Sequence, residues 1–352
     1  MARTVRILVI VTWLRTGMCV AQSAAKQPQP LPRQVTLGSV LSWLPADTEV
    51  VIGASGPFPF PDLAAIPDPS SGELSRAELA LRTQSNLPLS LFQLRNGGLR
   101  ESLKDKQVAL AVEGSRHFRP PPVGGAMRYE GCAIVVMQGR TPVDVDAFMN
   151  STVSLAKRFE KIAGQSVAVF EELTGNGVWT TFVAFPRKDI VAIATDLSYL
   201  RTVLTRLNGT PGPRALPDSL PEWKYVNTRA PVWGIRHYDK SQARLDPTSP
   251  FQDPAAASFP DPRAVGVTFY FEPFERRQAL ITYLPATEDY RSLLLDYLSM
   301  ADADAASQGE FRIGFLQAGP GALQGLVSLT PAEALYRLLF GLAGMLGHAA
   351  SI

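Results

Sequence analysis

From residue 106 onward the sequence repeats one pattern, in which β-rich runs joined by turns are followed by an amphipathic helix. The runs expected to form strands are 107–113, 132–138, 167–172, 178–185, 190–195, 264–272, 279–284, 311–317 and 322–329, and the helices expected after them are 142–162, 196–207, 288–300 and 331–347. Successive strands joined by short turns pair antiparallel, and a sheet buries its apolar face under helices. The order therefore predicts an α+β fold of mostly antiparallel sheet with helices on one face.

Two of these helices begin with the same chemical signature. Residues 141–144 read Thr-Pro-Val-Asp and residues 330–333 read Thr-Pro-Ala-Glu. The Thr oxygen caps free amides, Pro suits the first helical position, and the acid suits the positive end of the helix dipole. Their recurrence after strand pairs suggests repeated ββα modules and an internal duplication.

Shorter signals complete the expected fold. A helix is expected at 36–44 and strands at 49–54 and 232–236, and the Asn-Gly pair within 175–177 favours a tight hairpin. Along 264–272, residues 265, 267, 269 and 271 share one side of a strand, and residues 266, 268 and 270 share the other.

Proline-rich stretches divide the chain. We expect a signal peptide at 1–25, a Pro-rich linker at 26–34, an N-terminal α+β half at 35–210, a Pro-rich connector at 211–221 and a C-terminal α+β half at 222–352. Residues 246–263 are expected to form a long surface loop.

The first 25 residues have the order of a secretory signal. Arg3 and Arg6 precede the apolar run 7–14, and Ser23 and Ala25 supply small residues for cleavage after Ala25. The run is too short to span a bilayer, which needs about 20 apolar residues. Arg15 stands against this interpretation, and a buried first element of a cytosolic domain is the alternative. The sequence thus predicts a secreted or periplasmic protein.

Composition fits a globular protein, with 46% hydrophobic and 19% charged residues. The formal net charge of +2 falls to −1 if the signal leaves, since three arginines and no acid leave with it. A near-neutral chain is a poor partner for nucleic acid, which requires a concentrated basic surface. Cleavage also removes Cys19, so that Cys132 becomes the only thiol.

His237 and Asp239 are the candidate catalytic residues. They follow the expected strand 232–236 with one residue between them, which allows a general base and its orienting partner to lie on one side. A strand end meeting a polar loop is the plainer interpretation.

Other chemistry has less support in the sequence. Cys132 lies in an apolar run, where burial raises a thiol pKa. The 53–57 segment departs from a nucleophile turn. By residue type, the acid pairs Glu171–Glu172 and Asp302 with Asp304 could serve as the acid and base of a glycosidase. Glu171 and Glu172 face opposite sides of a strand, and solvated charge is the favoured interpretation of these acids. No metal-binding spacing or phosphate-binding glycine loop is found in the sequence, and we expect no cofactor and no metal.

Two apolar features are candidates for contact with a ligand, a partner or a membrane surface. Phe58 and Phe60 lie in the Pro-rich segment 57–61, either as exposed anchors or folded onto the core. The segment 338–346 is apolar on nearly all sides, and glycines recur every third residue from 341 to 347; this favours close packing on a sheet and leaves room for peripheral membrane contact.

These observations favour a non-enzymatic exported binding or scaffold protein that holds an unidentified protein or apolar ligand. The alternative is a secreted hydrolase with a dispersed active site using His237.

Overall fold

The computed structural model of the chain describes residues 35–55, 107–119, 128–138, 156–174, 177–209, 212–230, 233–237, 264–271, 278–285, 311–319 and 321–329, with residue 146 and isolated residues between 287 and 299. The chain divides into two compact units, Met1–Thr36 and Leu37–Ile352. Every element discussed below belongs to the second unit.

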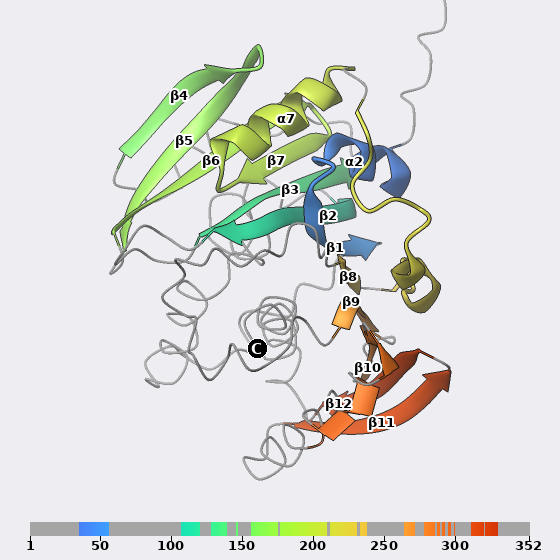
Figure 1. The fold of residues 1–352 in the computed structure, drawn as a ribbon. Helices are drawn as coiled ribbons and strands as arrows, with labels where there is room; N and C mark the ends of the chain where they lie inside the picture. The colour runs from blue at the N-terminus through green and yellow to red at the C-terminus, as the bar shows by residue number, and fades with distance from the viewer. Residues whose placement is uncertain are drawn as a thin grey trace, which may run out of the picture. The chain divides into compact units, whose positions relative to one another are not determined.

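A single antiparallel sheet of twelve strands dominates this part of the chain (Figure 1). The strands are β1 (Thr48–Ser55), β2 (Gln107–Arg119), β3 (Arg128–Gln138), β4 (Ala156–Ile162), β5 (Gln165–Thr174), β6 (Gly177–Arg187), β7 (Ile190–Ala194), β8 (Trp233–His237), β9 (Ala264–Phe271), β10 (Gln278–Pro285), β11 (Phe311–Gly319) and β12 (Ala322–Leu329). Their order across the sheet is β11-β12-β10-β9-β8-β1-β2-β3-β7-β6-β5-β4. The expected α+β class with a large antiparallel sheet is confirmed, as is the β5–β6 hairpin, in which Thr174 pairs with Gly177.

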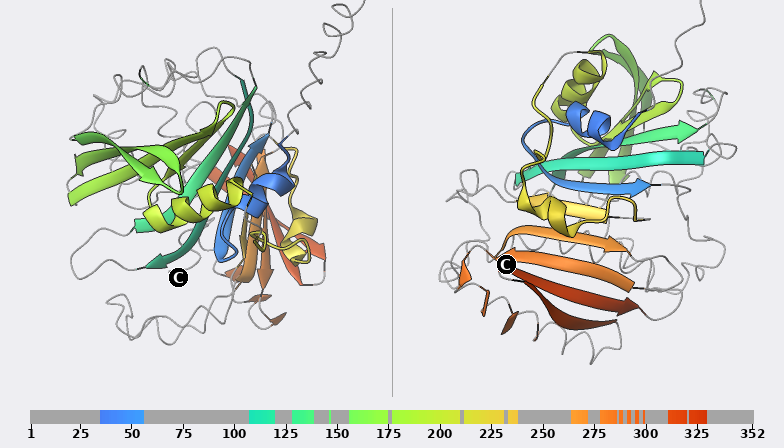
Figure 2. Two further views of the ribbon diagram at one scale, coloured as in Figure 1. Left: turned by 90° about the horizontal axis from the view of Figure 1, so that it is seen from above. Right: turned by 90° about the vertical axis from the view of Figure 1, so that its right-hand side faces the viewer.

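Three helices contact the same side of the sheet, which we call the helix-bearing face: α2 (Leu37–Trp43), α7 (Leu197–Leu207) and the 3-10 helix η2 (Pro221–Tyr225) (Figure 2). Asp196 caps α7 by accepting a hydrogen bond from the Tyr199 amide at 2.7 Å. Near the other end of α7, Arg206 donates to the carbonyl oxygen of Leu44 at 2.5 Å, which joins this helix to the chain after α2. Among the helices that the structure describes, none is long and apolar enough to cross a membrane.

Two glycines allow close packing on this face. A Cβ on Gly114 would lie 2.7 Å from Leu44 Cδ1 and 2.7 Å from the Tyr199 hydroxyl, so the helix layer contacts the β2 backbone directly. A Cβ on Gly53 would lie 2.2 Å from the indole ring of Trp233, which is fully buried. A side chain at either position would have to displace its neighbour.

The opposite face carries an apolar core of its own. Side chains alternate between faces along a strand, and Ala133 therefore points away from the helices that cover its neighbours. The buried cluster that includes it consists of Ala111, Ala133, Val135, Met137, Ala168, Phe170, Val183, Val191 and Ile193. Both faces of the β2-β3-β7-β6-β5 region thus contribute to the core.

The strand order is similar in the two directions away from the central β1–β8 pair. On one side β1, β2 and β3 are followed by β7 and β6, and on the other side β8, β9 and β10 are followed by β12 and β11. In both halves the third strand pairs with the strand that comes last in the chain within that half, β3 with β7 and β10 with β12. A short helix comes before the first strand each time, α2 before β1 and η2 before β8.

The structure corrects the helix expected at 142–162. Its last seven residues form strand β4, in which every residue from Ala156 to Ile162 pairs with β5. The rest of the expected helix, residues 142–155, lies outside the described residues, apart from Asp146, which is helical. Pairing with a formed neighbour outweighs the favourable helix propensity of Ala, Lys, Arg and Glu here.

Candidate functional site

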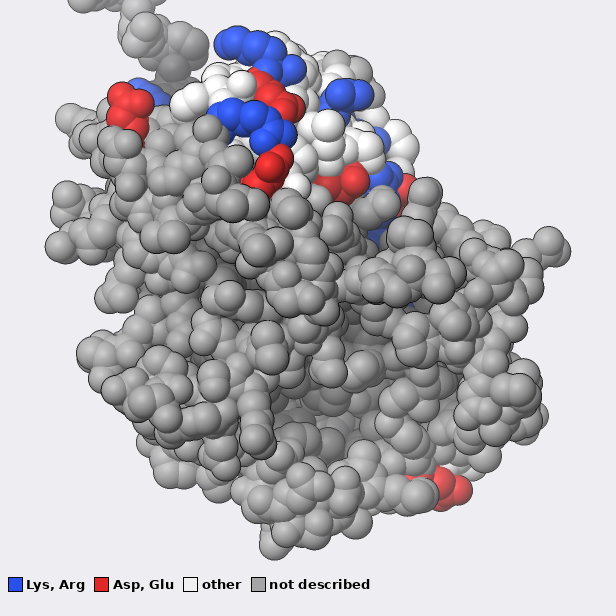
Figure 3. All heavy atoms as spheres, turned by 90° about the vertical axis from the view of Figure 1, so that its left-hand side faces the viewer, with Lys and Arg blue, Asp and Glu red and all other residues white. Residues whose placement is uncertain are grey.

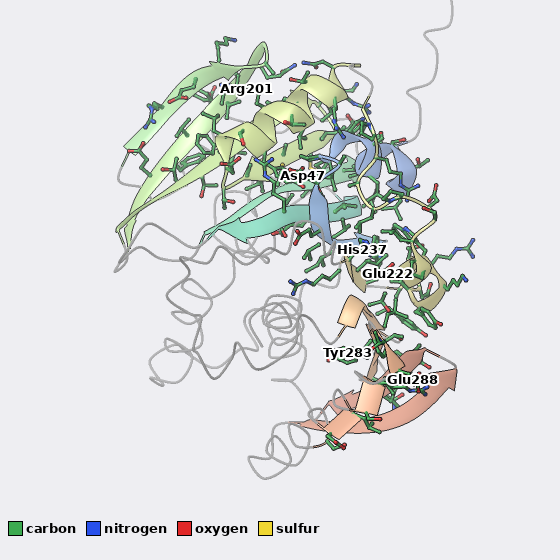
Figure 4. The ribbon with its side chains drawn as sticks, in the orientation of Figure 1. Asp47, Arg201, Glu222, His237, Tyr283 and Glu288 are labelled. Carbon is green, nitrogen blue, oxygen red and sulfur yellow. The ribbon has the colours of Figure 1, made fainter. Side chains whose placement is uncertain are left out.

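His237 ends strand β8 and faces a carboxylate that the sequence did not suggest. Its Nδ1 lies 2.6 Å from Oε1 of Glu222, which belongs to η2 (Figure 4). The side chain of His237 is 29% exposed, whereas that of Glu222 is completely buried. A buried carboxylate therefore holds one nitrogen of a partly exposed imidazole.

The position of Glu222 follows from how η2 begins and packs. Pro221 occupies the first turn, where its missing N–H costs nothing, and Glu222 is the acid of that turn. Trp223 fixes the helix by donating from Nε1 to the Pro217 carbonyl oxygen at 3.0 Å, and its ring centroid lies 6.2 Å from that of Trp233 on β8.

A third glycine makes room for the carboxylate. Gly266 on β9 pairs with His237, and a Cβ on it would lie 2.1 Å from Oε1 of Glu222. Thr268, two residues further along the same face, donates to the Tyr225 carbonyl oxygen at 3.3 Å. Residues 266 and 268 thus lie on the same side of the strand, as expected. At both positions η2 covers that side.

The electrostatics of the Glu222–His237 pair allow acid–base chemistry. A fully buried carboxylate is unfavourable without a donor or a positive partner, and His237 supplies the one hydrogen bond found for Glu222. The second oxygen, Oε2, is buried and has no hydrogen-bond partner among the residues that the structure describes. A carboxylate at Nδ1 orients an imidazole and stabilises its protonated form, which is the arrangement of a general base.

Of the two candidate catalytic residues, the structure therefore describes one. Asp239 lies outside the described residues. Glu222 takes the position of orienting partner that the sequence suggested for Asp239. Glu222 is 15 residues away from His237 in the chain, in a Pro-rich segment interpreted as a connector. The only sequence signal was an acid directly after a proline, a common helix start.

The other residues singled out from the sequence fall into two groups. Phe58, Phe60, Asp302 and Asp304 lie outside the described residues. Cys132 is buried, and burial together with the charge of Glu113 raises the pKa of its thiol far above the ordinary value. It fills space in the core, as expected.

Glu171 is engaged in an ion pair at the surface. Its Oε1 lies 2.5 Å from Nη1 of Arg158, and Nε of Arg158 lies 3.0 Å from Oε1 of Glu160. The hydrogen bond from Glu171, and then that from Glu160, raises the pKa of the Arg158 guanidinium. Glu171 is thus a partly exposed charge that is ion-paired with Arg158, whereas the sequence suggested only a solvated charge.

A polar group on the opposite face, near the centre of the sheet, was missed by sequence reasoning. Glu113 and Ser115 on β2 and Arg236 on β8 are all at least nine-tenths buried. Ser115 and Arg236 both pair with Val50, so their side chains lie on one face. Ser115 Oγ is buried, and within the described part of the chain it has no hydrogen-bond partner. The alternation in β2 could have predicted the shared face of Glu113 and Ser115, but not that Arg236 lies on the same face.

Arg116 has a structural role at the ends of α2 and α7. Its guanidinium donates to Ser198 Oγ at 2.6 Å and to Asp47 at 3.2 Å, and it lies 5.5 Å from the ring centroid of Tyr199. The Tyr199 hydroxyl lies 2.7 Å from Thr48 Oγ1, and burial raises its pKa well above the ordinary value. This cluster ties three elements together.

On strands β10, β12 and β11, the helix-bearing face includes residues that are only half-buried or are exposed. Leu280 pairs with Leu326, and Leu326 pairs with Gly314; Gln324 lies beside them and donates to Thr282 Oγ1 at 3.3 Å. Gly314 is exposed and Leu280, Gln324 and Leu326 are half-buried. We call these four residues the open strip.

Within the described part of the chain, no group of three or more His, Cys, Asp or Glu residues is placed to hold a metal ion. No protein family, curated protein or solved structure matches this chain.

Proposed function

We propose that this chain is an exported, non-enzymatic binding or scaffold protein that holds a protein partner or an apolar ligand. The observation that carries the proposal is the open strip on β10, β12 and β11. Its two leucines are half-buried on the face that α2 and α7 cover in the N-terminal half. Partly exposed apolar side chains on a hydrogen-bonded sheet suit an extended or apolar ligand.

Substitution within the open strip tests the proposal. The wild-type chain, purified from its native envelope fraction, should carry a reproducible protein or lipid identified by mass spectrometry. Leu326→Glu should lose it, because a charge in the strip opposes apolar contact. Arg201→Glu on the exposed side of α7 is the control and should keep it. Recovery of nothing reproducible with the wild type, or equal recovery with Leu326→Glu, would overturn the proposal.

Export is part of the same proposal and rests on the residues 1–25. The exported chain should begin at Lys26, as determined by N-terminal sequencing of material from the periplasm or the medium. Full-length, uncleaved chain confined to the cytoplasm would contradict it.

A second candidate function is a secreted hydrolase with His237 as the general base, and the Glu222–His237 distance of 2.6 Å favours it. His237→Gln and Glu222→Gln should then each abolish hydrolysis of an ester, peptide or glycoside substrate while circular dichroism stays unchanged. A folded wild-type chain inactive on all three substrate classes would remove this candidate.

We also infer that the chain arose by duplication of an ancestral half, with the repeated ββα modules of the sequence as its remnant. The support is the matching strand order on either side of β1 and β8 and the short helix before each. A protein made of one half alone that superimposes on both would support this origin, and unrelated counterparts for the two halves would oppose it.

A further inference from the structure

The two edges of the sheet differ in chemistry. Strand β4 forms one edge and carries Lys157, Arg158, Glu160 and Lys161 among its seven residues. Figure 3 shows basic and acidic side chains interspersed over the described part of one side of the molecule. Charged side chains on an edge strand discourage pairing with another strand. The β4 edge is therefore protected.

Strand β11 forms the other edge and has no such protection. Its sequence is FRIGFLQAG, in which Arg312 is the one charged residue. In the part of the chain that the structure describes, β11 has β12 as its neighbour on one side only. A Cβ on Gly314 would meet no atom within 4 Å, so the helix-bearing side of the strand is open there.

The other half of the molecule shows which element can lie beside a strand in the position of β11. Counting outward from the centre, β11 corresponds to β6, since β6 is the second strand beyond β3 and β11 is the second strand beyond β10 in the sheet order. Strand β6 is paired on both sides, with β7 and with β5. The place outside β11 is therefore one that takes an antiparallel strand in the equivalent half.

We propose that the outer edge of β11 pairs antiparallel with β11 of a second copy of this chain, giving a symmetric homodimer with a continuous sheet. The register that pairs all nine residues sets Phe315 opposite its own copy and Arg312 opposite Ala318. No like charges meet in this arrangement. The same pairing of β4 would set Lys157 against Lys161, a like-charge contact that the β11 arrangement lacks, beside the opposite charges of Arg158 and Glu160.

The experiment measures the mass of the chain in solution by sedimentation equilibrium. The wild type should be dimeric. Ala318→Lys places two pairs of like charges across the dimer axis and should weaken dimerisation by about 2- to 30-fold, whereas Ala318→Glu places opposite charges there and should strengthen it by a similar factor. Misfolding would not give a tighter association that stops at the dimer. The Glu variant therefore distinguishes charge repulsion across the interface from misfolding as the cause of weaker dimerisation.

The matched control lies on the other edge. Phe159→Lys on β4 should leave the dimerisation constant unchanged. A wild-type monomer at all concentrations would overturn the proposal, as would two Ala318 variants that shift dimerisation in the same direction. A dimer that is lost in Phe159→Lys and unaffected by both Ala318 variants would place the interface on β4 and would also overturn it.

Discussion

Gly266 shows how one missing Cβ admits a buried carboxylate to the sheet. The Cβ of Gly266→Ala would lie 2.1 Å from Glu222 Oε1, so η2 or β9 would have to move. We expect a loss of about 1–3 kcal/mol in the free energy of unfolding, measured by urea denaturation. Gly314→Ala, whose Cβ meets nothing, is the matched control and should change it by less than about 0.5 kcal/mol. Equal effects of the two changes would mean that Glu222 does not occupy the observed position.

Cys132 should be inert in the folded chain. Burial first, and the negative charge of Glu113 second, raise the pKa of its thiol, so that the reactive thiolate is almost absent at pH 8. Ellman's reagent should not modify the native Cys19→Ser chain and should modify one thiol after unfolding in guanidinium. Raising the pH to 9 without unfolding should change little, because the folded-state pKa lies far above that value. Rapid modification of the native chain would contradict the burial of Cys132.

Candidate site residues were predictable from the sequence only where the signal was local. His237 ends a short apolar strand and is one of three histidines, which sufficed to select it. Its partner Glu222 reaches it through the fold of η2 over Gly266, and a glycine in a strand does not reveal what lies above it. Ser115 and Arg236 likewise share a face of the sheet only because each of them pairs with Val50.

At the scale of elements, the N-terminal cap of α7 makes a measurable contribution to stability. Asp196 Oδ1 accepts hydrogen bonds from the Tyr199 amide and from Ser198 Oγ, both at 2.7 Å. Asp196→Ala should lower the free energy of unfolding by about 1–2 kcal/mol. Asp218→Ala is the control, because Asp218 is mostly exposed and its ion pair with Arg214 should contribute less than about 1 kcal/mol. If both substitutions lower the free energy of unfolding by the same amount in thermal or urea denaturation, the cap is not formed in solution.

Strand β4 shows where element prediction fails. Its sequence AKRFEKI consists mostly of good helix formers, and it directly follows a stretch with a helical start signal. The strand forms because all seven residues pair with β5, a contact that propensity does not encode. By contrast α7, with its Asp196 cap and apolar stripe, and β12, with its bounds of 322–329, agree with the expectation to within one residue.

At the scale of the whole molecule, the sequence indicated two halves but could not show that they share a sheet. The Pro-rich connector 211–221 suggested a boundary, whereas the structure pairs β1 with β8 from Val50–Arg236 to Gly53–Trp233. Such pairing joins residues about 180 positions apart, and no local pattern specifies it. Because the two halves share a sheet, we expect the stability of each half to depend on the other.

Trp233 at this junction provides the test of that dependence. It is fully buried with its indole over Gly53, and Trp233→Ala should lower the free energy of unfolding by about 3–5 kcal/mol. If the halves unfold together, hydrogen exchange should accelerate by the same factor in β3 and in β10, one strand from each half. Leu295→Ala, whose side chain is 39% exposed, should alter exchange in neither strand. Faster exchange in β10 with full protection retained in β3 would show instead that the β1–β8 pair joins two independently stable halves.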